Sequence, residues 1–144
     1  MDRIEQKICN TQKNIFSFAA KKGYSVKSFC EAFLNSDFCA EAFDTEYSRY
    51  QFETPMECMD FLVPEIDGKV EKSDYADVET AGYVGMMYRY LYFVTPYTSR
   101  ELAERVPFDV VASTLDVSAI KGEHLVIEDI CTECGLEYFP DNDT

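Results

Sequence analysis

Apolar residues recur every three or four positions through most of this chain, and start and stop signals for helices separate the apolar runs. The first run places five residues on one predicted helix face: Ile4, Ile8, Thr11, Ile15 and Phe18. Gly23 then supplies a left-handed stop. The pattern predicts an all-α fold, a compact helical bundle of about seven or eight helices in one domain over 1–144, with an acidic tail at 140–144.

Two segments carry strong start signals for helices. The sequence Thr54-Pro55-Met56-Glu57 combines a capping box with proline at the first helical position, and predicts a short helix that ends before Pro64. Thr98-Ser99-Arg100-Glu101 is a second capping box and predicts a helix through Val106. Ser25 and Ser36 are placed to cap two more helices.

A long helix is predicted from Asp77 to Val94, after a turn-rich boundary at 64–77. Its apolar face is predicted to comprise Val78, Ala81, Gly85, Tyr88 and Tyr92. Gly82 and Gly85 each lower helix propensity by about 1 kcal/mol, so we expect another helix to pack closely against them. The last helix ends near Cys134, and its start at 125–127 is also compatible with a strand. We favour the helix.

The two halves of the chain show a faint internal repeat. Residues 24–29 match residues 97–102, each with an aromatic residue, a hydroxyl cap and a basic residue two positions on. We predict pseudo-repeats over 1–66 and 74–139, each a long helix followed by three short ones. The alternative is that capped helices resemble one another without duplication.

The charge of the chain is large and uneven. The 27 Asp and Glu outnumber the 13 Lys and Arg, for a net charge of −14, and no Lys or Arg follows Lys121. Residues 1–30 carry six basic and two acidic side chains, so the acidity lies in the remainder. Such a surface repels nucleic acid and membranes and attracts basic partners. With neither a signal-peptide core nor an apolar run of ~18 residues, we expect a cytoplasmic protein without direct nucleic-acid or membrane binding.

The sequence offers few groups for catalysis. His124, the only histidine, follows Glu123 near a turn, and we interpret it as solvent-facing. The Cys131 and Cys134 pair has the spacing of a zinc knuckle or redox pair, but zinc needs four ligands and a redox thiol favours a helix start. This pair ends a predicted helix among acids, so we interpret all six cysteines as reduced and structural. We expect no catalytic residue, no cofactor and no metal.

Tyrosine, arginine and carboxylates suggest a binding surface. Tyr and Arg are adjacent at 47–50 and at 88–90, and both types are enriched at binding hot spots. Nine acids fall within residues 53–79, and Tyr83, Tyr90 and Tyr97 recur every seven residues. We expect about half of these tyrosines in the core and half at an interface. The predicted partner-binding residues are Glu57, Asp60, Glu71, Asp74, Asp77, Tyr83, Arg89, Tyr90 and Tyr97.

The motifs also resemble those of known proteins. The order of Gly82-Tyr83-Val84, Tyr88-Arg89-Tyr90 and the 98–102 box resembles small uncharacterised proteins of gut Firmicutes. The first half, from Gly23-Tyr24-Ser25 through Tyr47 and Pro55, resembles a second such group. Members tend to be encoded beside ADP-ribosyltransferase-like proteins of toxin type, so the resemblance implies an antitoxin or accessory role. This chain carries Leu91-Tyr92 where they tend to carry Trp, and no functional residue is transferred.

These observations lead to one expected function and two alternatives. We expect a non-enzymatic protein-binding regulator, antitoxin-like or an inhibitor, whose acidic and Tyr-rich face neutralises a partner protein with a basic surface. The first alternative is an acidic DNA- or RNA-mimic inhibitor of a nuclease or DNA-binding defence protein, similar to an anti-CRISPR. The second is a small enzyme that uses His124 or the Cys131 and Cys134 pair. A homodimer is left open.

Overall fold

The computed structural model describes residues 1–73 and 77–143. In these residues the chain forms nine α-helices and two short 3-10 helices, with no β-strand, which confirms the all-α prediction and adds at least one helix to it. The elements are α1 Arg3–Lys21, α2 Val26–Leu34, α3 Asp37–Ala42, η1 Arg49–Phe52, α4 Pro55–Ile66, α5 Val78–Val94, α6 Ser99–Arg105, α7 Phe108–Ala112, α8 Leu115–Lys121, α9 Glu123–Glu133 and η2 Pro140–Asp143.

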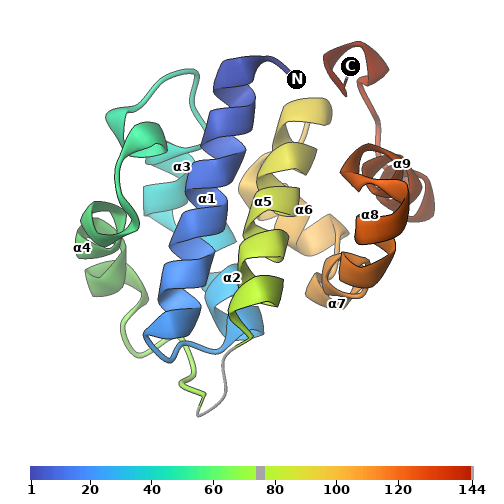
Figure 1. The fold of residues 1–144 in the computed structure, drawn as a ribbon. Coiled ribbons are helices and arrows are strands. Elements are labelled where there is room, and N and C mark those ends of the chain that lie inside the picture. Colours follow the sequence, from blue (N-terminus) through green and yellow to red (C-terminus); the bar gives the residue numbers. More distant parts are fainter. Residues whose placement is uncertain (74–76, 144) are drawn as a thin grey trace.

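The two longest helices form the centre of the molecule. Helices α1 and α5 lie side by side, and the shorter helices lie to both sides of them and behind them (Figure 1). In the view of Figure 1, α4 lies at the left edge and α7 to α9 lie at the right, with α2 and α6 behind the central pair. Helix α1 comes from the start of the chain and α5 from its middle. Because these two helices pack together, the two halves of the chain share one core.

Glycine allows this close pairing. A Cβ built on Gly85 would lie 2.6 Å from Cγ of Phe16 and 2.9 Å from the backbone oxygen of Gln12, both on α1. A Cβ on Gly82 would lie 2.5 Å from Oγ of Ser17. These distances leave no room for a side chain, so the expected close helix contact at both glycines is confirmed.

Phenylalanine rings fill the space behind the central pair. The ring of Phe16 meets those of Phe29 and Phe33 edge-on, each with centroids 5.1 Å apart, and Phe33 meets Phe43 at 5.8 Å. All four side chains are buried. Edge-to-face pairs of this kind contribute about 0.5–1.5 kcal/mol each beyond the burial of apolar area. They fix α2 and the end of α3 beneath α1.

Two predicted helix faces are wrong in detail. On α1, Ile4 is 59 % exposed, and the buried side instead includes Gln12, Phe16 and Ala19 as well as Ile15. The face is rotated because it must meet the glycines of α5. Helix α5 has no single apolar face, since every residue from Ala81 to Leu91 except Met86 is buried. Neighbours on all sides cover it, which periodicity cannot indicate.

The predicted helix starts are mostly confirmed. The Thr98 box is complete: Glu101 N donates to Thr98 Oγ1 at 3.2 Å, and Thr98 N donates to Glu101 Oε1 at 3.0 Å. Ser36 accepts from Cys39 N at 2.9 Å. At Thr54 the capping box is incomplete: Glu57 N donates to the Thr54 hydroxyl, and the reciprocal hydrogen bond to the Glu57 side chain is not formed.

Two other boundary predictions differ from the structure. Ser25 precedes α2 as predicted, but its side chain forms no cap; its backbone N–H donates to the carbonyl of Glu71 at 2.9 Å. Helix α4 continues through Pro64 to Ile66, so the predicted end before Pro64 is wrong. Pro64 has no N–H group, so the helical hydrogen bond to the carbonyl of Asp60 is missing. Asp60 is exposed, and a water molecule can bind this carbonyl instead.

The end of the chain folds back onto its beginning. Helix α9 confirms helix rather than strand at 125–127. After Gly135, Phe139 N donates to the carbonyl of Val94 at 2.7 Å, and the Asn142 amide donates to the carbonyl of Phe93 at 2.6 Å. The amino terminus donates to the carbonyl of Asn142. The expected acidic tail is therefore attached to α5 through residue 142, and the internal repeat stays a prediction.

The α1–α5 contact gives a test of the fold. Gly85→Ala should lower the free energy of unfolding by about 1–3 kcal/mol, because its Cβ would overlap a buried ring and a backbone oxygen. Gly82→Ala should cost less, because the Ser17 hydroxyl can rotate away. Urea denaturation of both variants measures the difference. Equal or increased stability of Gly85→Ala, as helix propensity alone predicts, would contradict the packing.

Candidate binding surface

A buried polar cluster surrounds Arg89 in the middle of α5. The Arg89 side chain is fully buried, and its Nη1 donates to Oδ1 of Asp44 at 2.8 Å. Its Nε donates to Gln12 Oε1 at 2.8 Å, and its Nη2 donates to Ser99 Oγ at 2.9 Å. The guanidinium therefore joins α1, α5, α6 and the loop after α3.

Asp44 completes the cluster. Its carboxylate also accepts from the Ser99 backbone N–H at 2.7 Å and the Ser99 hydroxyl at 2.6 Å. Burial alone would lower the pKa of Arg89, but Cys39 and Asp44 hold that pKa above its ordinary value. Among the described residues, no buried side-chain nitrogen or oxygen lacks a hydrogen-bond partner. The cluster is a satisfied structural group with no reactive atom facing solvent.

Three of the predicted partner-binding residues therefore lie inside the protein. Arg89 is 0 % exposed, Tyr83 is 6 % and Tyr90 is 9 % exposed, so their placement on an exposed interface is wrong for this structure. The Tyr83 hydroxyl forms a 2.7 Å hydrogen bond with Thr114 Oγ1. The reason is topological: α5 is the central helix, and its tyrosines and arginine meet other helices on every side.

The other predicted residues on and beside α5 are scattered. Tyr97 is half-buried, with the Arg105 guanidinium 4.6 Å from its ring and Glu137 N donating to its hydroxyl at 3.1 Å. Glu71 is exposed. Asp77 caps α5, and hydrogen bonds from the Thr80 side chain and backbone lower the pKa of its carboxyl. Asp74 lies outside the described residues. These residues do not form one site.

The two remaining predicted residues, Glu57 and Asp60, lie on the exposed side of α4. Four large apolar side chains in the same segment of the chain, residues 47–61, are also exposed. Their exposed fractions are 74 % for Tyr47, 47 % for Phe52, 62 % for Met56 and 53 % for Phe61. We call these six residues the η1–α4 surface.

The aromatic part of the η1–α4 surface is ordered by ring contacts. Phe61 meets the ring of Tyr50 edge-on at 5.1 Å, and the rings of Tyr47 and Phe52 lie 6.4 Å apart. The Arg49 guanidinium lies 5.0 Å from the Tyr50 ring. Exposed side chains that are already held by neighbours lose little entropy when a partner covers them.

The carboxylates of this surface crowd each other. A hydrogen bond with Glu53 raises the pKa of Glu57, and the negative charge of Glu53 adds to this shift. Because like charges held together favour a nearby cation, this crowding suits a partner that carries Lys or Arg.

The apolar residues of the η1–α4 surface were missed as binding residues in the sequence. A signal was present: α4 carries Met56 and Phe61 in addition to its buried residues Cys58, Met59, Leu62 and Ile66. With Val63, seven large or apolar side chains lie on a helix of 12 residues, more than one buried stripe requires.

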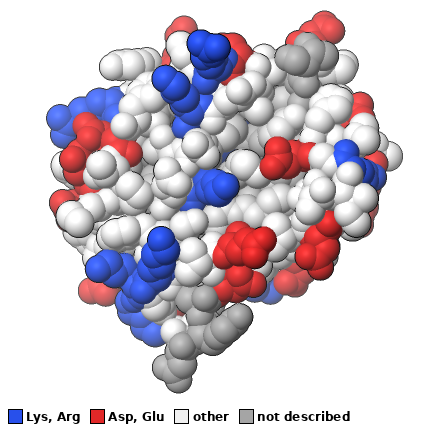
Figure 2. Space-filling view, viewed as in Figure 1, with Lys and Arg blue, Asp and Glu red and all other residues white. Residues whose placement is uncertain are grey.

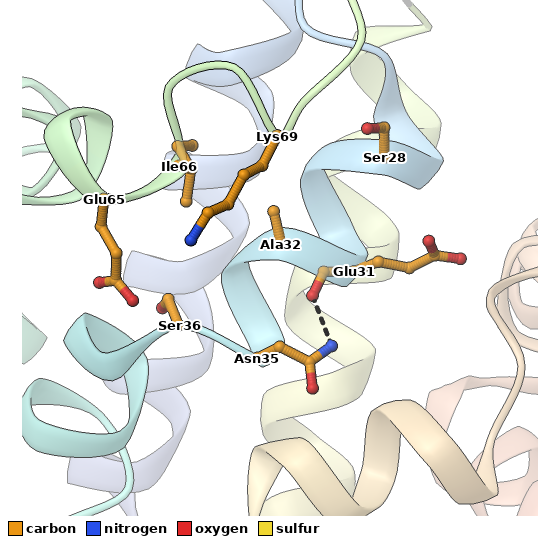
Figure 3. Close-up of a pocket in the computed structure, with 8 residues that line it drawn as sticks. All are labelled: Ser28, Glu31, Ala32, Asn35, Ser36, Glu65, Ile66 and Lys69. Carbon is orange, nitrogen blue, oxygen red and sulfur yellow. Dashed lines mark hydrogen bonds between the residues drawn. The ribbon is translucent and has the colours of Figure 1, made fainter.

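A hollow of about 250 Å³ lies between α2 and the end of α4 (Figure 3). One wall is structural, because Glu65 accepts from the backbone N–H groups of Asp37 at 2.5 Å and Phe38 at 3.0 Å. The Lys69 side chain extends into the hollow toward Ser36. The Glu65 carboxylate therefore caps the start of α3.

The sequence offered His124 and the cysteines as candidate catalytic groups. In the part of the chain that the structure describes, no three His, Cys, Asp or Glu side chains are grouped to hold a metal ion. His124 is exposed at the start of α9, as expected. Burial raises the pKa of Cys9 and Cys58 to about 12 and of Cys39 to about 11, so these thiols are not nucleophilic thiolates near neutral pH.

The surface charge follows the sequence asymmetry. On the face shown in Figure 2, Lys and Arg lie mainly over the half occupied by α1, and Asp and Glu predominate toward α7 to α9. Of the described helices, none combines the length and apolar character needed to cross a membrane.

Comparisons with protein-family models, with curated proteins and with solved structures found no match to this chain. The resemblance to the gut-Firmicutes proteins stays a prediction.

The Arg89 cluster predicts a large loss of stability on truncation. Arg89→Ala should lower the free energy of unfolding by about 3–5 kcal/mol, because it leaves the Asp44 carboxylate and the Gln12 amide without their cation. The matched control is Arg100→Ala, which breaks the exposed pair with Asp37 and should cost about 0–1 kcal/mol. Urea unfolding measures both, and equal losses would contradict the role of the cluster.

Thiol reactivity tests the interpretation of the cysteines. Five of the six thiols are buried and Cys134 is half-buried, so a disulfide reagent should modify one thiol quickly in the native protein and the rest only on unfolding. Cys134→Ser should remove the fast phase, whereas Cys131→Ser should retain it. Rapid modification of Cys131 in the native state would contradict the structural interpretation.

Proposed function

We propose that this protein is a non-enzymatic regulator that binds another protein through the η1–α4 surface, in the manner of an antitoxin or inhibitor. The observation that carries the proposal is the concentration of exposed aromatic and apolar side chains around Glu57 and Asp60 in residues 47–61. A cluster of large exposed apolar groups bordered by charge is typical of protein-binding sites.

The geometry of α4 supports a protein as the partner. Met56, Glu57, Asp60 and Phe61 are the exposed positions of its first two turns, and helical spacing places the two acids between the two apolar side chains on one helix face. Such a face fits an apolar groove edged by Lys or Arg. The apolar side chains supply affinity through burial, and the carboxylates select a basic partner and speed its encounter.

The nucleic-acid mimic receives less support. A mimic of a phosphate backbone requires regularly spaced carboxylates, whereas aromatic and thioether groups interrupt the acids of the η1–α4 surface. The net charge of −14 still draws the protein toward basic surfaces, so the alternative stays a prediction.

The proposal is tested with the full chain purified from its source organism. A tagged protein should retain a partner, and the double variant Met56→Ser/Phe61→Ser should weaken that binding about tenfold or more, because it removes two apolar contacts. The matched control is Phe139→Ser, which changes an aromatic residue of similar exposure (44 %) away from this surface. Calorimetry with the purified partner measures the dissociation constants.

Charge and activity provide the second measurement. Glu57→Lys/Asp60→Lys should weaken binding at low salt, with a smaller effect at high salt, because exposed charges are screened. An inhibitor should also suppress the partner's own activity, and the Met56→Ser/Phe61→Ser variant should not. Unchanged affinity in both double variants would contradict the proposal, and displacement of the partner by DNA would favour the mimic.

A further inference from the structure

A hollow of about 350 Å³ is lined by residues from the start of the chain, from α1, from α5 and from the start of α9. Four of these residues carry sulfur or imidazole donors. They are the thioethers of Met1 and Met86, the thiol of Cys9 and the imidazole of His124, the only histidine of the chain. Their positions in the sequence span more than a hundred residues, so the tertiary fold brings them to one hollow.

Two of the sulfur atoms lie at the separation of two ligands of one metal ion. The Cys9 thiol donates to the thioether of Met1, and the two sulfur atoms are 4.0 Å apart. Metal–sulfur bonds measure about 2.3 Å, so two sulfur ligands in tetrahedral or trigonal geometry lie roughly 3.8–4.0 Å apart. An ion can therefore replace the proton between these atoms with little movement of either side chain.

The kind of donor identifies the ion. Thiolate and thioether sulfur are soft ligands and select Cu(I). Zn²⁺ sites in proteins use thiolate, imidazole and carboxylate, and no three such groups are assembled in the part of the chain that the structure describes. The sequence argument against a metal concerned zinc at Cys131 and Cys134, whereas the residues of this hollow lie elsewhere and include two thioethers.

From the sulfur pair and the shared hollow we infer that this protein binds one Cu(I) ion. Cys9 supplies a thiolate, and Met1 and Met86 supply thioethers. The imidazole of His124 is the fourth ligand. Cu⁺ displaces the thiol proton: the sulfur–hydrogen bond breaks, a sulfur–copper bond forms, and one H⁺ passes to water without any change in oxidation state.

Burial and charge set the conditions for binding. Cys9 is 4 % exposed, and burial raises the pKa of its thiol to about 12. Near neutral pH the thiol is protonated, so each Cu⁺ that binds releases one proton. The apparent affinity should therefore rise about tenfold from pH 7 to pH 8. Glu123 also lines the hollow, and its negative charge attracts a cation.

A bound ion would connect parts of the chain that are distant in sequence. The amino group of Met1 also donates to the carbonyl of Asn142, so the ion links α1, α5 and α9 to the segment around residue 142. Binding should therefore raise the urea midpoint. None of the residues that line the hollow belongs to the η1–α4 surface, so the inference goes beyond the proposed function and does not depend on it.

Competition with a coloured chelator tests the site on the full chain. The reduced protein, kept free of oxygen, is titrated into the Cu(I) complex of bicinchoninate, which absorbs visible light. The parent protein should withdraw one Cu(I) per chain, with the rise in affinity from pH 7 to pH 8 given above. No withdrawal by the parent protein would overturn the inference.

Variants locate the ion. Cys9→Ser should abolish the uptake, and Met86→Leu, a change that conserves volume at a half-buried position, should weaken it about tenfold or more. The matched controls are Cys134→Ser, which removes the half-buried thiol, and Met87→Leu, the neighbouring methionine outside the hollow. Both controls should keep full uptake, and metal-free urea midpoints check folding. Uptake that is lost in Cys134→Ser, or kept at full affinity in both Cys9→Ser and Met86→Leu, would overturn the inference.

Discussion

The ion pair between Arg89 and Asp44 is the interaction on which the rest of the structure depends. It is the one salt bridge among the described residues whose two side chains are both largely buried, and its hydrogen bonds reach α1 through Gln12 and α6 through Ser99. A buried charge is costly unless its partners are complete. In this cluster the hydrogen-bond partners of Arg89 are complete, so the cluster fixes how helices that are distant in sequence meet. The fold is specified at its centre by polar geometry as well as by apolar packing.

The shortness of the outer helices explains why the surfaces are available for binding. Helix α5 buries side chains on all of its sides, with glycines that admit Phe16 of α1, whereas α1 keeps one exposed face. Helices α4 and α8 lie at the edges, where only one side of each can reach the core, and both carry more apolar residues than that side can cover. The surplus is exposed as the η1–α4 surface and as Val117 and Ile120 on α8. Exposed carboxylates accompany the apolar groups in both places: Glu57 and Asp60 on α4, and Asp116 on α8.

Part of the candidate site could be predicted from the sequence. Glu57 and Asp60 are exposed, as the acid-rich stretch indicated, whereas the exposed apolar side chains of the same segment were not expected. Tyr83, Arg89 and Tyr90 were placed wrongly, since their residue types suit an interface and a core equally well. A polar side chain in the middle of a helix is expected to be exposed if its tertiary contacts are not known. Once Asp44, Gln12 and Ser99 converge on Arg89 from other parts of the chain, burial becomes favourable. The spacing of apolar residues along the sequence does not indicate that these side chains meet.

The sequence by itself determined the helices, the positions of most caps, the close approach at Gly82 and Gly85, and the acidic character of the surface. These features depend on local backbone preference, on the absence of a side chain, and on composition, all of which are properties of neighbouring residues. The tertiary structure alone decided which helix became central, which charges were buried and which apolar side chains stayed outside. Those outcomes depend on contacts between residues 40 or more positions apart, as between Arg89 and Asp44, and local sequence carries no record of them.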